Sequence, residues 1–391
     1  MNRLHFKTWF NLGPGLLLFL SLFCPCRFAG GQDLKLARKA EKIHRAVLTI
    51  DSHTDTPLKL MQKGFNITLR HDPKMENSKI DFPRMKEGGL DGIFFAVFIS
   101  QGPRNTETYE NVRKKAIALF DTIHDVVTRF PDQAGLALTP RDAVRLKHQG
   151  KRAVFIGIEN GYAIGKDLSL ISTYYLRGAR YITLCHTKNN DICDSSTDTV
   201  ENNGLSPFGY EVVREMNELG LMVDVSHISD KAVMDVLSYA KTPVIASHSC
   251  AKALCNNRRN LSDELLKAIA DKGGVIQMCI LSNYVKAPEK KPSGEKVSQP
   301  LATVSDVVDH IDHMVKIAGI DHVGIGTDFD GGGGVTGCFD VSEMGNITLE
   351  LVKRGYSRKG IRKIWGGNLM RVMNQTEKVA RAYITSCHCN Q

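Results

Sequence analysis

The chain has 391 residues, of which 42% are hydrophobic and 24% are charged, enough apolar sequence to bury the core of a large globular domain. Its formal net charge is +9, from 51 Lys and Arg against 42 Asp and Glu, but no basic stripe with interleaved aromatic residues accompanies this charge. The composition therefore argues against a nucleic-acid-binding protein.

The N-terminal segment has the composition of a secretory signal peptide. Two basic residues precede an apolar run over residues 10–23, and small residues follow it. We therefore predict a signal peptide at residues 1–29 and an exported protein, periplasmic or secreted. No later stretch is long and apolar enough for a transmembrane span in the mature chain. Cys24 leaves lipid anchoring as an alternative, although the bulky residue before it suits a lipoprotein cleavage site poorly.

The cysteine content is compatible with an oxidising compartment. Ten cysteines occur, of which Cys24 and Cys26 lie in the predicted signal peptide. The other eight can form disulfides after export, but their pairing cannot be read from the sequence. None of them has the spacing of a zinc ribbon.

The first predicted strand carries a pair of metal-binding residue types. The apolar and β-branched run Leu48–Asp51 leads into a polar tip with His53 and Asp55. Residues two apart in a strand point to the same side, so one imidazole and one carboxylate face one point. A mixed nitrogen and oxygen ligand set suits zinc. The plain alternative is a strand end with a buried histidine and a capping aspartate.

Five further apolar runs end in a residue type that binds metals. They are Arg152–Glu159, Tyr181–His186, Leu221–His227, Pro243–His248 and His322–Asp330. In a (β/α)8 barrel the active site is built from the carboxyl ends of the strands, so residues far apart in the sequence meet at one mouth. We expect these six strand ends to converge in that way.

The rest of the chain completes an alternating pattern of strands and helices. Residues 92–99 and 273–280 read as two more strands, without a ligand at their ends, which makes eight. Helical periodicity is predicted for residues 34–47, 107–130, 209–219, 229–239, 262–272 and 304–318, and in the C-terminal segment to about 382. The pattern predicts one α/β domain at residues 30–391, a (β/α)8 TIM barrel of the metal-dependent hydrolase type with extra terminal helices.

The predicted ligands divide into two sets around a shared acid. His53 and Asp55 would hold one zinc, His227 and His248 a second, and Glu159 would bridge the two. Two zinc ions about 3.5–4 Å apart share and acidify one water, which gives a bridging hydroxide near neutral pH. The predicted cofactor is therefore two Zn²⁺ ions per chain.

The remaining residues supply candidates for substrate binding and proton transfer. Asp328 is the candidate proton shuttle, while its competitor Asp330 suits a capping role better. His186 would polarise the scissile carbonyl or steady the oxyanion. The loop after the run Pro243–His248 carries Arg258 and Arg259. An exposed basic pair is usually solvated, yet a guanidinium at this place is what a carboxylate-bearing substrate would need.

Seven local motifs resemble those of the membrane dipeptidases, also called renal dipeptidases, of peptidase family M19. The resemblance extends over about residues 43–374. The motifs are Ile50-Asp51-Ser52-His53-Thr54-Asp55, Gly157-Ile158-Glu159, Gly204-Leu205-Ser206-Pro207-Phe208-Gly209, Asp224-Val225-Ser226-His227, Ser247-His248-Ser249, Arg258-Arg259-Asn260 and Gly326-Thr327-Asp328-Phe329-Asp330-Gly331. Members of this family are (β/α)8 barrels with two zinc ions, so the resemblance implies this fold and a metallodipeptidase activity.

The resemblance also implies roles for individual residues. It implies the same five metal ligands as the chemistry above, namely His53, Asp55, Glu159, His227 and His248. It further implies that His186 and Arg259 contact the substrate and that Asp328 handles the proton. The choice of Arg259 over its neighbour rests mainly on the resemblance.

The sequence departs from the animal members of that family at its C-terminus and at its cysteines. Residues 385–391 are polar and lack the hydrophobic tail of a glycolipid anchor signal. Cys255 falls at a position that is bridged in the animal enzymes, but the partner expected after Tyr284 is absent, and Lys188 stands where those enzymes have a half-cystine. We therefore expect an exported bacterial member.

The predicted function is zinc-dependent hydrolysis of dipeptides, and the resemblance suggests tolerance of a D-residue at the C-terminal position. One alternative is an amidohydrolase acting on a lactam, a lactone, a nucleobase or another small amide, although such enzymes more often begin with His-x-His. Another is a catalytically silent binding or scaffold protein, although no ligand is missing. Small dipeptides are the expected partners, and a homodimer is an open option for assembly.

Overall fold

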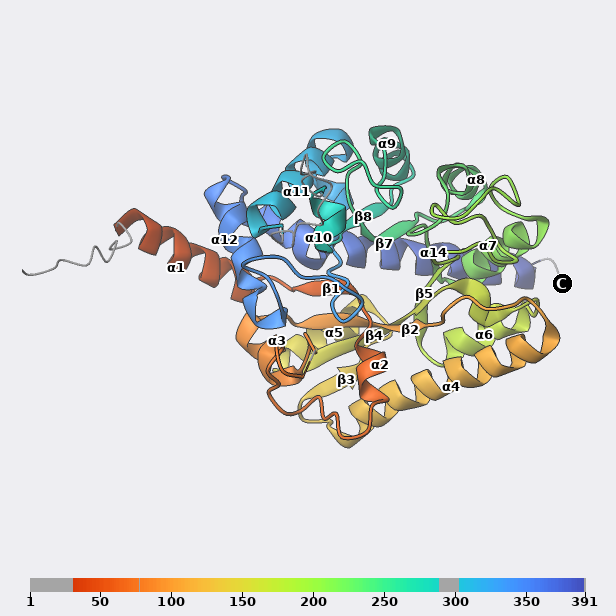
Figure 1. Cartoon of the computed structure of the whole chain (residues 1–391), viewed down its shortest axis with the longest axis horizontal. Coiled ribbons are helices and arrows are strands. Elements are labelled where there is room, and N and C mark those ends of the chain that lie inside the picture. Colours follow the sequence, from red (N-terminus) through yellow and green to blue (C-terminus); the bar gives the residue numbers. More distant parts are fainter. Residues whose placement is uncertain (1–30, 77, 288–301, 390–391) are drawn as a thin grey trace, which may run out of the picture.

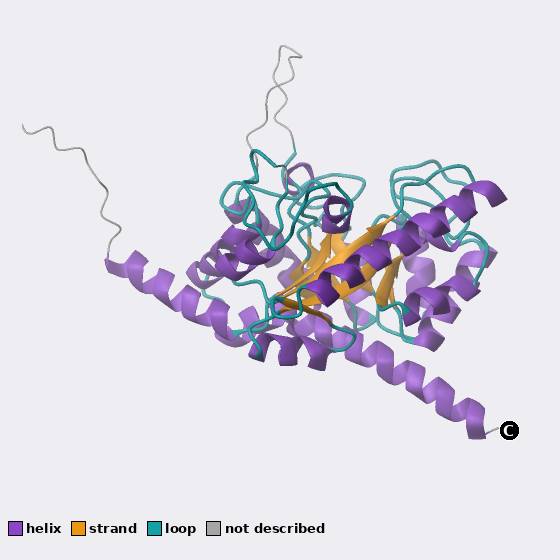
Figure 2. Cartoon of the chain, turned by 90° about the horizontal axis from the view of Figure 1, so that it is seen from below, coloured by secondary structure: helices purple, strands orange, loops and turns teal. Residues whose placement is uncertain are grey.

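The computed structural model describes residues 31–76, 78–287 and 302–389. The predicted signal peptide at residues 1–29 lies outside the described residues. A central group of strands is surrounded by helices (Figure 1), and the connecting loops gather along one side of the strands (Figure 2). None of the described helices combines the length and the apolar character that crossing a bilayer requires.

The strands form one parallel sheet that curls into a barrel. Its strands are β1 (Ile50–Thr54), β2 (Gly92–Phe98), β3 (Ala134–Leu136), β4 (Arg152–Glu159), β5 (Ala179–Thr183), β6 (Met222–Asp224), β7 (Ile245–Ser249), β8 (Val275–Met278) and β9 (Val323–Ile325). The order is β1-β2-β4-β5-β6-β7-β8-β9, and β3 pairs beside the start of β4. The eight-stranded barrel predicted from the sequence is confirmed, with β3 as a short addition that the sequence did not reveal.

The barrel closes between its first and last strands just beyond their ends. Thr54 and Phe329 form a parallel bridge. The amide of Asp55 donates to the carbonyl of Phe329 at 2.9 Å, and the amide of Asp328 donates to the carbonyl of His53 at 3.0 Å. The closing contacts therefore involve the same short segments that carry three of the predicted site residues.

Helices connect successive strands and form the outer layer. They are α1 (Gly31–Ala46), α2 (Thr56–Leu60), α3 (Phe82–Gly88), α4 (Thr106–Arg129), α5 (Pro140–His148), α6 (Ser169–Leu176), α7 (Pro207–Leu219), α8 (Asp230–Tyr239), α9 (Asp263–Asp271), α10 (Ser282–Val285), α11 (Val304–Ala318), α12 (Gly345–Lys353), α13 (Arg358–Arg362) and α14 (Asn368–Cys389). Helix α5 follows Thr139, where Thr139 and Asp142 cap each other's backbone amides as a capping box. The extra terminal helices are α12, α13 and α14.

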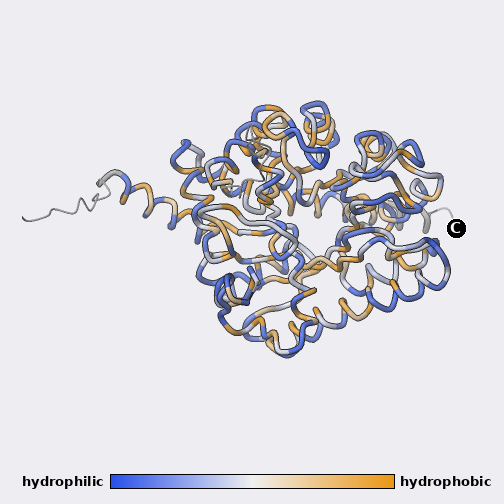
Figure 3. The backbone as a smooth tube through the Cα atoms, viewed as in Figure 1, coloured by the Kyte–Doolittle hydropathy of each residue, from blue (hydrophilic) through white to orange (hydrophobic). Residues whose placement is uncertain are grey.

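Side chains that alternate along each strand divide the apolar core in two. On β2, Ile93 and Phe95 pack toward the helices, whereas Phe94 packs inside the barrel against Phe155 and Tyr181. Hydrophobic positions accordingly follow the central strands, while they alternate with hydrophilic ones along α4 (Figure 3). The first turns of α14 contribute Leu369, Met370, Val372 and Met373 to the interior group.

A buried guanidinium links α3 to the segment after β9. Arg84 is fully buried, and its Nε donates to Oδ2 of Asp81 at 2.6 Å. Its Nη1 donates to Oδ2 of Asp340 at 2.9 Å, and its Nη2 donates to the carbonyl of Ser78 at 2.8 Å. Every nitrogen of the guanidinium thus has an acceptor, which is the condition under which a buried charge is tolerated.

Candidate active site

The predicted site residues lie at the carboxyl end of the barrel. His53 and His248 lie within β1 and β7, and Glu159 is the last residue of β4. His186, His227 and Asp328 each lie three residues beyond the end of a strand, and Asp55 precedes α2. The local reason is the same in each case, since a buried apolar strand delivers the next polar residue to the mouth.

Glu159 lies at the centre of a ring of histidines. Its Oε2 is 3.4 Å from Nε2 of His53, and its Oε1 is 3.0 Å from Nε2 of His227. The same Oε1 is 3.5 Å from Nε2 of His248 and 3.7 Å from Nε2 of His186. Among these side chains, only that of His186 is appreciably exposed, at 23%. The convergence of strand ends expected from the sequence is therefore found at this carboxylate.

Three overlapping groups of side chains bring ligand atoms close enough to hold a cation. Within each group, the ligand atoms lie within 4.8 Å of one another. The groups are His53 with Glu159 and His248, Glu159 with His186 and His227, and His53 with Asp55 and Asp328. All predicted metal ligands belong to at least one group, and Glu159 belongs to two.

Three buried side-chain atoms in these groups have no hydrogen-bond partner among the described residues. They are Nε2 of His53, Oδ1 of Asp55 and Nδ1 of His227. In addition, Nε2 of His227 and Nε2 of His248 approach to 2.7 Å. Buried polar atoms are rarely left unpaired, and bare nitrogen and oxygen atoms that face one point fit a divalent cation such as Zn²⁺.

The acidic side chains of the site are buried close together, which shifts their pKa values. Burial raises the pKa of Asp55 well above its usual range, and the charge of Glu159 adds to the effect. Burial likewise raises the pKa of Asp328 to about 7. The pKa of Glu159 is held well below its usual range, because the charge of His53 and a hydrogen bond with His227 outweigh the opposite effect of burial. A divalent cation would relieve this repulsion among the acids.

The histidines fall into two electrostatic classes. Burial lowers the pKa of His53, but the proximity of Glu159 and the negative charges of Asp55 and Asp328 together outweigh this effect and raise the pKa to about 10. Burial, with the positive charges of Arg259 and His53 nearby, lowers the pKa values of His227 and His248 well below the usual range. The pKa of His186 is also lowered by burial. Three of the four imidazoles therefore stay neutral near pH 7, the form in which histidine binds metals.

The two arginines of the loop after β7 have different environments. Arg258 is exposed, and its Nη2 lies 3.4 Å from the carbonyl of Asp198. Arg259 is buried at 4% exposure, with Nη2 donating to the carbonyl of His248 at 3.2 Å and its guanidinium over the ring of Tyr284. Its Nε has no hydrogen-bond partner in the part of the chain that the structure describes. The buried member of the pair is thus the one that reaches the histidines.

The backbone at the site adopts conformations that the sequence did not reveal. His227 and Asp328 have φ values of 71° and 61°, in the left-handed region that non-glycine residues rarely adopt. Asp330 shares this conformation but uses its carboxylate elsewhere, accepting from the amide of Lys79 at 2.7 Å and from Oγ1 of Thr56 at 2.8 Å. Asp328, and not Asp330, therefore has its carboxylate among the candidate ligands.

A glycine lets two of the acids approach each other. A Cβ on Gly331 would overlap both the carboxylate of Asp55 and the carboxylate of Asp328. This position needs the absence of a side chain rather than conformational freedom, because its φ is not positive. Any larger residue here would push apart two of the ligands of the third group.

Sequence reasoning missed several buried polar residues that support the site. Asp51 accepts from the amide and Oγ1 of Thr327 at 2.9 and 2.6 Å, and so ties β1 to the segment before Asp328. Tyr181 and Ser247 contact His53 and His248 at 2.8 Å each. For Asp51 and Tyr181 the available signal was a charged or aromatic residue inside a predicted strand, whereas Ser247 gave no such signal.

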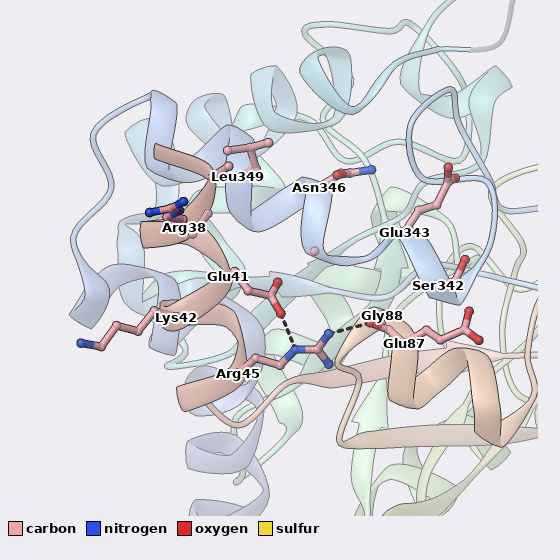
Figure 4. Close-up of a pocket in the computed structure, with 13 residues that line it drawn as sticks. Arg38, Glu41, Lys42, Arg45, Glu87, Gly88, Ser342, Glu343, Asn346 and Leu349 are labelled. Carbon is pink, nitrogen blue, oxygen red and sulfur yellow. Dashed lines mark hydrogen bonds and ion pairs between the residues drawn. The ribbon is translucent and has the colours of Figure 1, made fainter. Parts of the chain in front are cut away.

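A separate recess of about 680 Å³ lies between α1, α3 and α12 (Figure 4). Arg45 and Glu41 of its lining are already paired, since Nε of Arg45 donates to Glu41 at 2.7 Å, and Nη2 of Arg45 also donates to the carbonyl of Glu87 at 2.7 Å. None of the predicted site residues lines it. The candidate active site is therefore the barrel mouth and not this recess.

Comparison with known proteins identifies relatives over most of the chain. The family model of the membrane dipeptidases, peptidase family M19, matches residues 37–386. Dipeptidase tcpJ of Claviceps purpurea is 34% identical over 81% of this chain and 74% of its own, and dipeptidase ataJ of Aspergillus terreus is 32% identical over 88% of each. The crystal structure of the probable dipeptidase PvdM from Pseudomonas aeruginosa superposes with a TM-score of 0.82 at 32% identity, covering 89% of this chain and all of that one.

Proposed function

The chain belongs to the membrane dipeptidase family, peptidase family M19, and from this premise we propose that it hydrolyses dipeptides with two zinc ions bound at the barrel mouth. One observation carries the proposal. Ligand atoms from five strand ends meet around Glu159, while Nε2 of His53 and Oδ1 of Asp55 are buried without a hydrogen-bond partner among the described residues. A purely structural cluster would be expected to pair those atoms.

In the proposed centre, His53 and Asp55 would hold one metal ion, His227 and His248 would hold the other, and Glu159 would contribute to both. When bound, such ions lower the pKa of water and polarise a carbonyl oxygen. The short distances from Glu159 to the histidine nitrogens support the shared role of its carboxylate.

The other site residues act on the substrate. Asp328 takes a proton at its carboxylate and passes it to the leaving amine, a role supported by the position of this carboxylate beside His53 and Asp55 at the barrel mouth. His186 is neutral and partly exposed. It is therefore placed to donate an N–H to the carbonyl oxygen of the scissile bond, where negative charge develops.

Arg259 is proposed to bind the C-terminal carboxylate of the dipeptide. Replacing it by methionine should raise KM for a dipeptide about 10- to 100-fold, the worth of a hydrogen bond to a charged group at about 1.5–3 kcal/mol. It should also remove the preference for a dipeptide over its C-terminal amide. Steady-state kinetics on both substrates measure this, with Arg258→Met as the matched control because Arg258 is exposed. Equal rates on the dipeptide and the amide with the unaltered protein would refute the assignment.

Metal analysis and chelation test the function as a whole. The purified protein should contain two equivalents of zinc, lose dipeptide turnover on removal of the metal by a chelator, and regain it when Zn²⁺ is added back. A panel that includes a lactam and a lactone distinguishes the alternative of a different amidohydrolase. Undiminished turnover in the stripped protein, or faster hydrolysis of a lactam than of any dipeptide, would contradict the proposal.

Further aspects of the function are proposed on the sequence and the family. We propose that a D-residue is tolerated at the C-terminal position of the dipeptide. Comparing the hydrolysis of two dipeptides that differ only in an L- or a D-residue at that position tests this. Export rests on the basic and apolar N-terminal segment at residues 1–29. Assembly into a homodimer stays an open prediction, to be measured by light scattering.

A further inference from the structure

We propose that Tyr181 and the Ser247–Asp224 pair are positioning residues that keep a proton on Nδ1 of His53 and of His248, so that each imidazole presents Nε2 to the metal centre. The inference rests on the proposed metal binding. It concerns side chains that lie behind the histidines and touch neither substrate nor metal.

The first chain of hydrogen bonds begins at a backbone carbonyl. Oη of Tyr181 lies 3.1 Å from the carbonyl of Ser52, which can only accept, so the phenol donates its one proton there. Nδ1 of His53 lies 2.8 Å from the same Oη. Because the phenol proton is already used, Nδ1 must be the donor in that contact. In the neutral form of His53, the form that binds a metal, the one proton is therefore fixed on Nδ1, and Nε2 faces Glu159 at 3.4 Å.

The second chain begins at a buried carboxylate. The carboxylate of Asp224 accepts four hydrogen bonds. Its Oδ1 accepts from the amides of Ser226 and Ser247 at 3.0 and 2.8 Å, and its Oδ2 accepts from the hydroxyls of Thr183 and Ser247. The Ser247 hydroxyl lies 2.6 Å from Oδ2 of Asp224 and donates its hydrogen bond to that oxygen. Nδ1 of His248, 2.8 Å from the same hydroxyl oxygen, must then be the donor. Nε2 of His248 is left to face His227 and Glu159.

Water cannot replace the hydrogen bonds of these side chains, because the side chains are buried. Tyr181, Asp224 and Ser247 are all fully buried. A Cβ on Gly157 would overlap the ring of Tyr181, so the glycine two residues before Glu159 makes the space that the ring occupies. The hydroxyl is held by the ring's packing as well as by its hydrogen bonds. Loss of either hydroxyl leaves an imidazole free to move its proton to Nε2, where the proton competes with a cation.

Zinc affinity provides the first test. Competition with a chromophoric chelator should give dissociation constants about 10- to 100-fold weaker for Tyr181→Phe and for Ser247→Ala, the range found when partners of ligating histidines are removed. Two matched controls should stay within about threefold on the same scale. Tyr174→Phe removes a buried phenol that donates to the carbonyl of Ala163, and Thr183→Val removes a hydroxyl that donates to Asp224 without touching His248.

The protonation pattern itself provides a second test that does not depend on the variants folding. In the metal-free wild-type protein, ¹⁵N spectra of labelled histidine should show neutral His248 protonated on Nδ1. Protonation on Nε2 would overturn the inference, as would variants that bind Zn²⁺ as tightly as the wild type, or controls that lose as much affinity. Wild-type protein that binds no Zn²⁺ at all would overturn the proposed function and this inference with it. Weaker Zn²⁺ binding in Tyr181→Phe and Ser247→Ala, but not in the two controls, supports both the proposed function and this inference.

Discussion

Replacing Glu159 by glutamine is expected to reduce kcat for dipeptide hydrolysis by at least about a thousandfold, the effect of losing several kcal/mol of metal-assisted stabilisation. The substitution keeps the shape of the side chain but removes a charge. It would also direct an NH₂ group toward His53 or toward His227, whose nitrogens lie 3.4 and 3.0 Å from the present oxygens. An amide can accept on one side only, so it cannot serve two metal ions as a carboxylate can.

The measurement pairs steady-state kinetics with zinc content in the same preparations. Both should fall in Glu159→Gln, because the loss acts through the metals. Glu343→Gln is the matched control, since its side chain accepts from the amide of Phe339 far from the histidines and an amide oxygen can do the same. Glu159→Gln protein that keeps more than a tenth of the activity, or loses activity with both metals still bound, would contradict the bridging role.

The sequence was sufficient for the barrel because each strand obeys a simple rule. A buried parallel strand reads as a continuous apolar run, and the run Arg152–Glu159 coincides with β4 as found. The polar residue that follows such a run must lie at the mouth, whatever the loop does next. His186 and His227 therefore reach the site although they lie beyond the ends of β5 and β6.

The sequence was insufficient where a side chain acts through tertiary packing. Nothing local distinguishes Arg259 from Arg258, yet only one of them is buried among the histidines. The left-handed conformation of His227 is imposed by contacts such as the amide of Ser196 donating to its carbonyl at 2.7 Å. Tyr181 reads as an ordinary strand residue until its hydroxyl is placed between Ser52 and His53. Such roles depend on residues that are distant in the sequence, by 31 positions for Ser196 and His227 and by 128 for His53 and Tyr181.

The largest effect on stability is expected from Arg84→Met. The substitution fills a similar volume but leaves the carboxylates of Asp81 and Asp340 buried without their counter-charge. Breaking a buried ion pair from one side costs about 3–5 kcal/mol, because the remaining charge has lost both water and partner. The free energy of unfolding in urea, compared at equal metal content, should fall by that amount.

Arg70→Met is the matched control for this prediction. Arg70 pairs with Glu87 through two hydrogen bonds of 2.8 and 3.1 Å, yet both side chains are about half exposed. Water replaces the lost partner there, so the expected cost is at most about 1 kcal/mol. Adding Asp340→Asn to Arg84→Met should restore part of the stability, since it removes one stranded charge while the amide oxygen can still accept from the amide of Ser342. A double variant less stable than Arg84→Met would show that packing around the guanidinium, and not the buried charge, sets the cost.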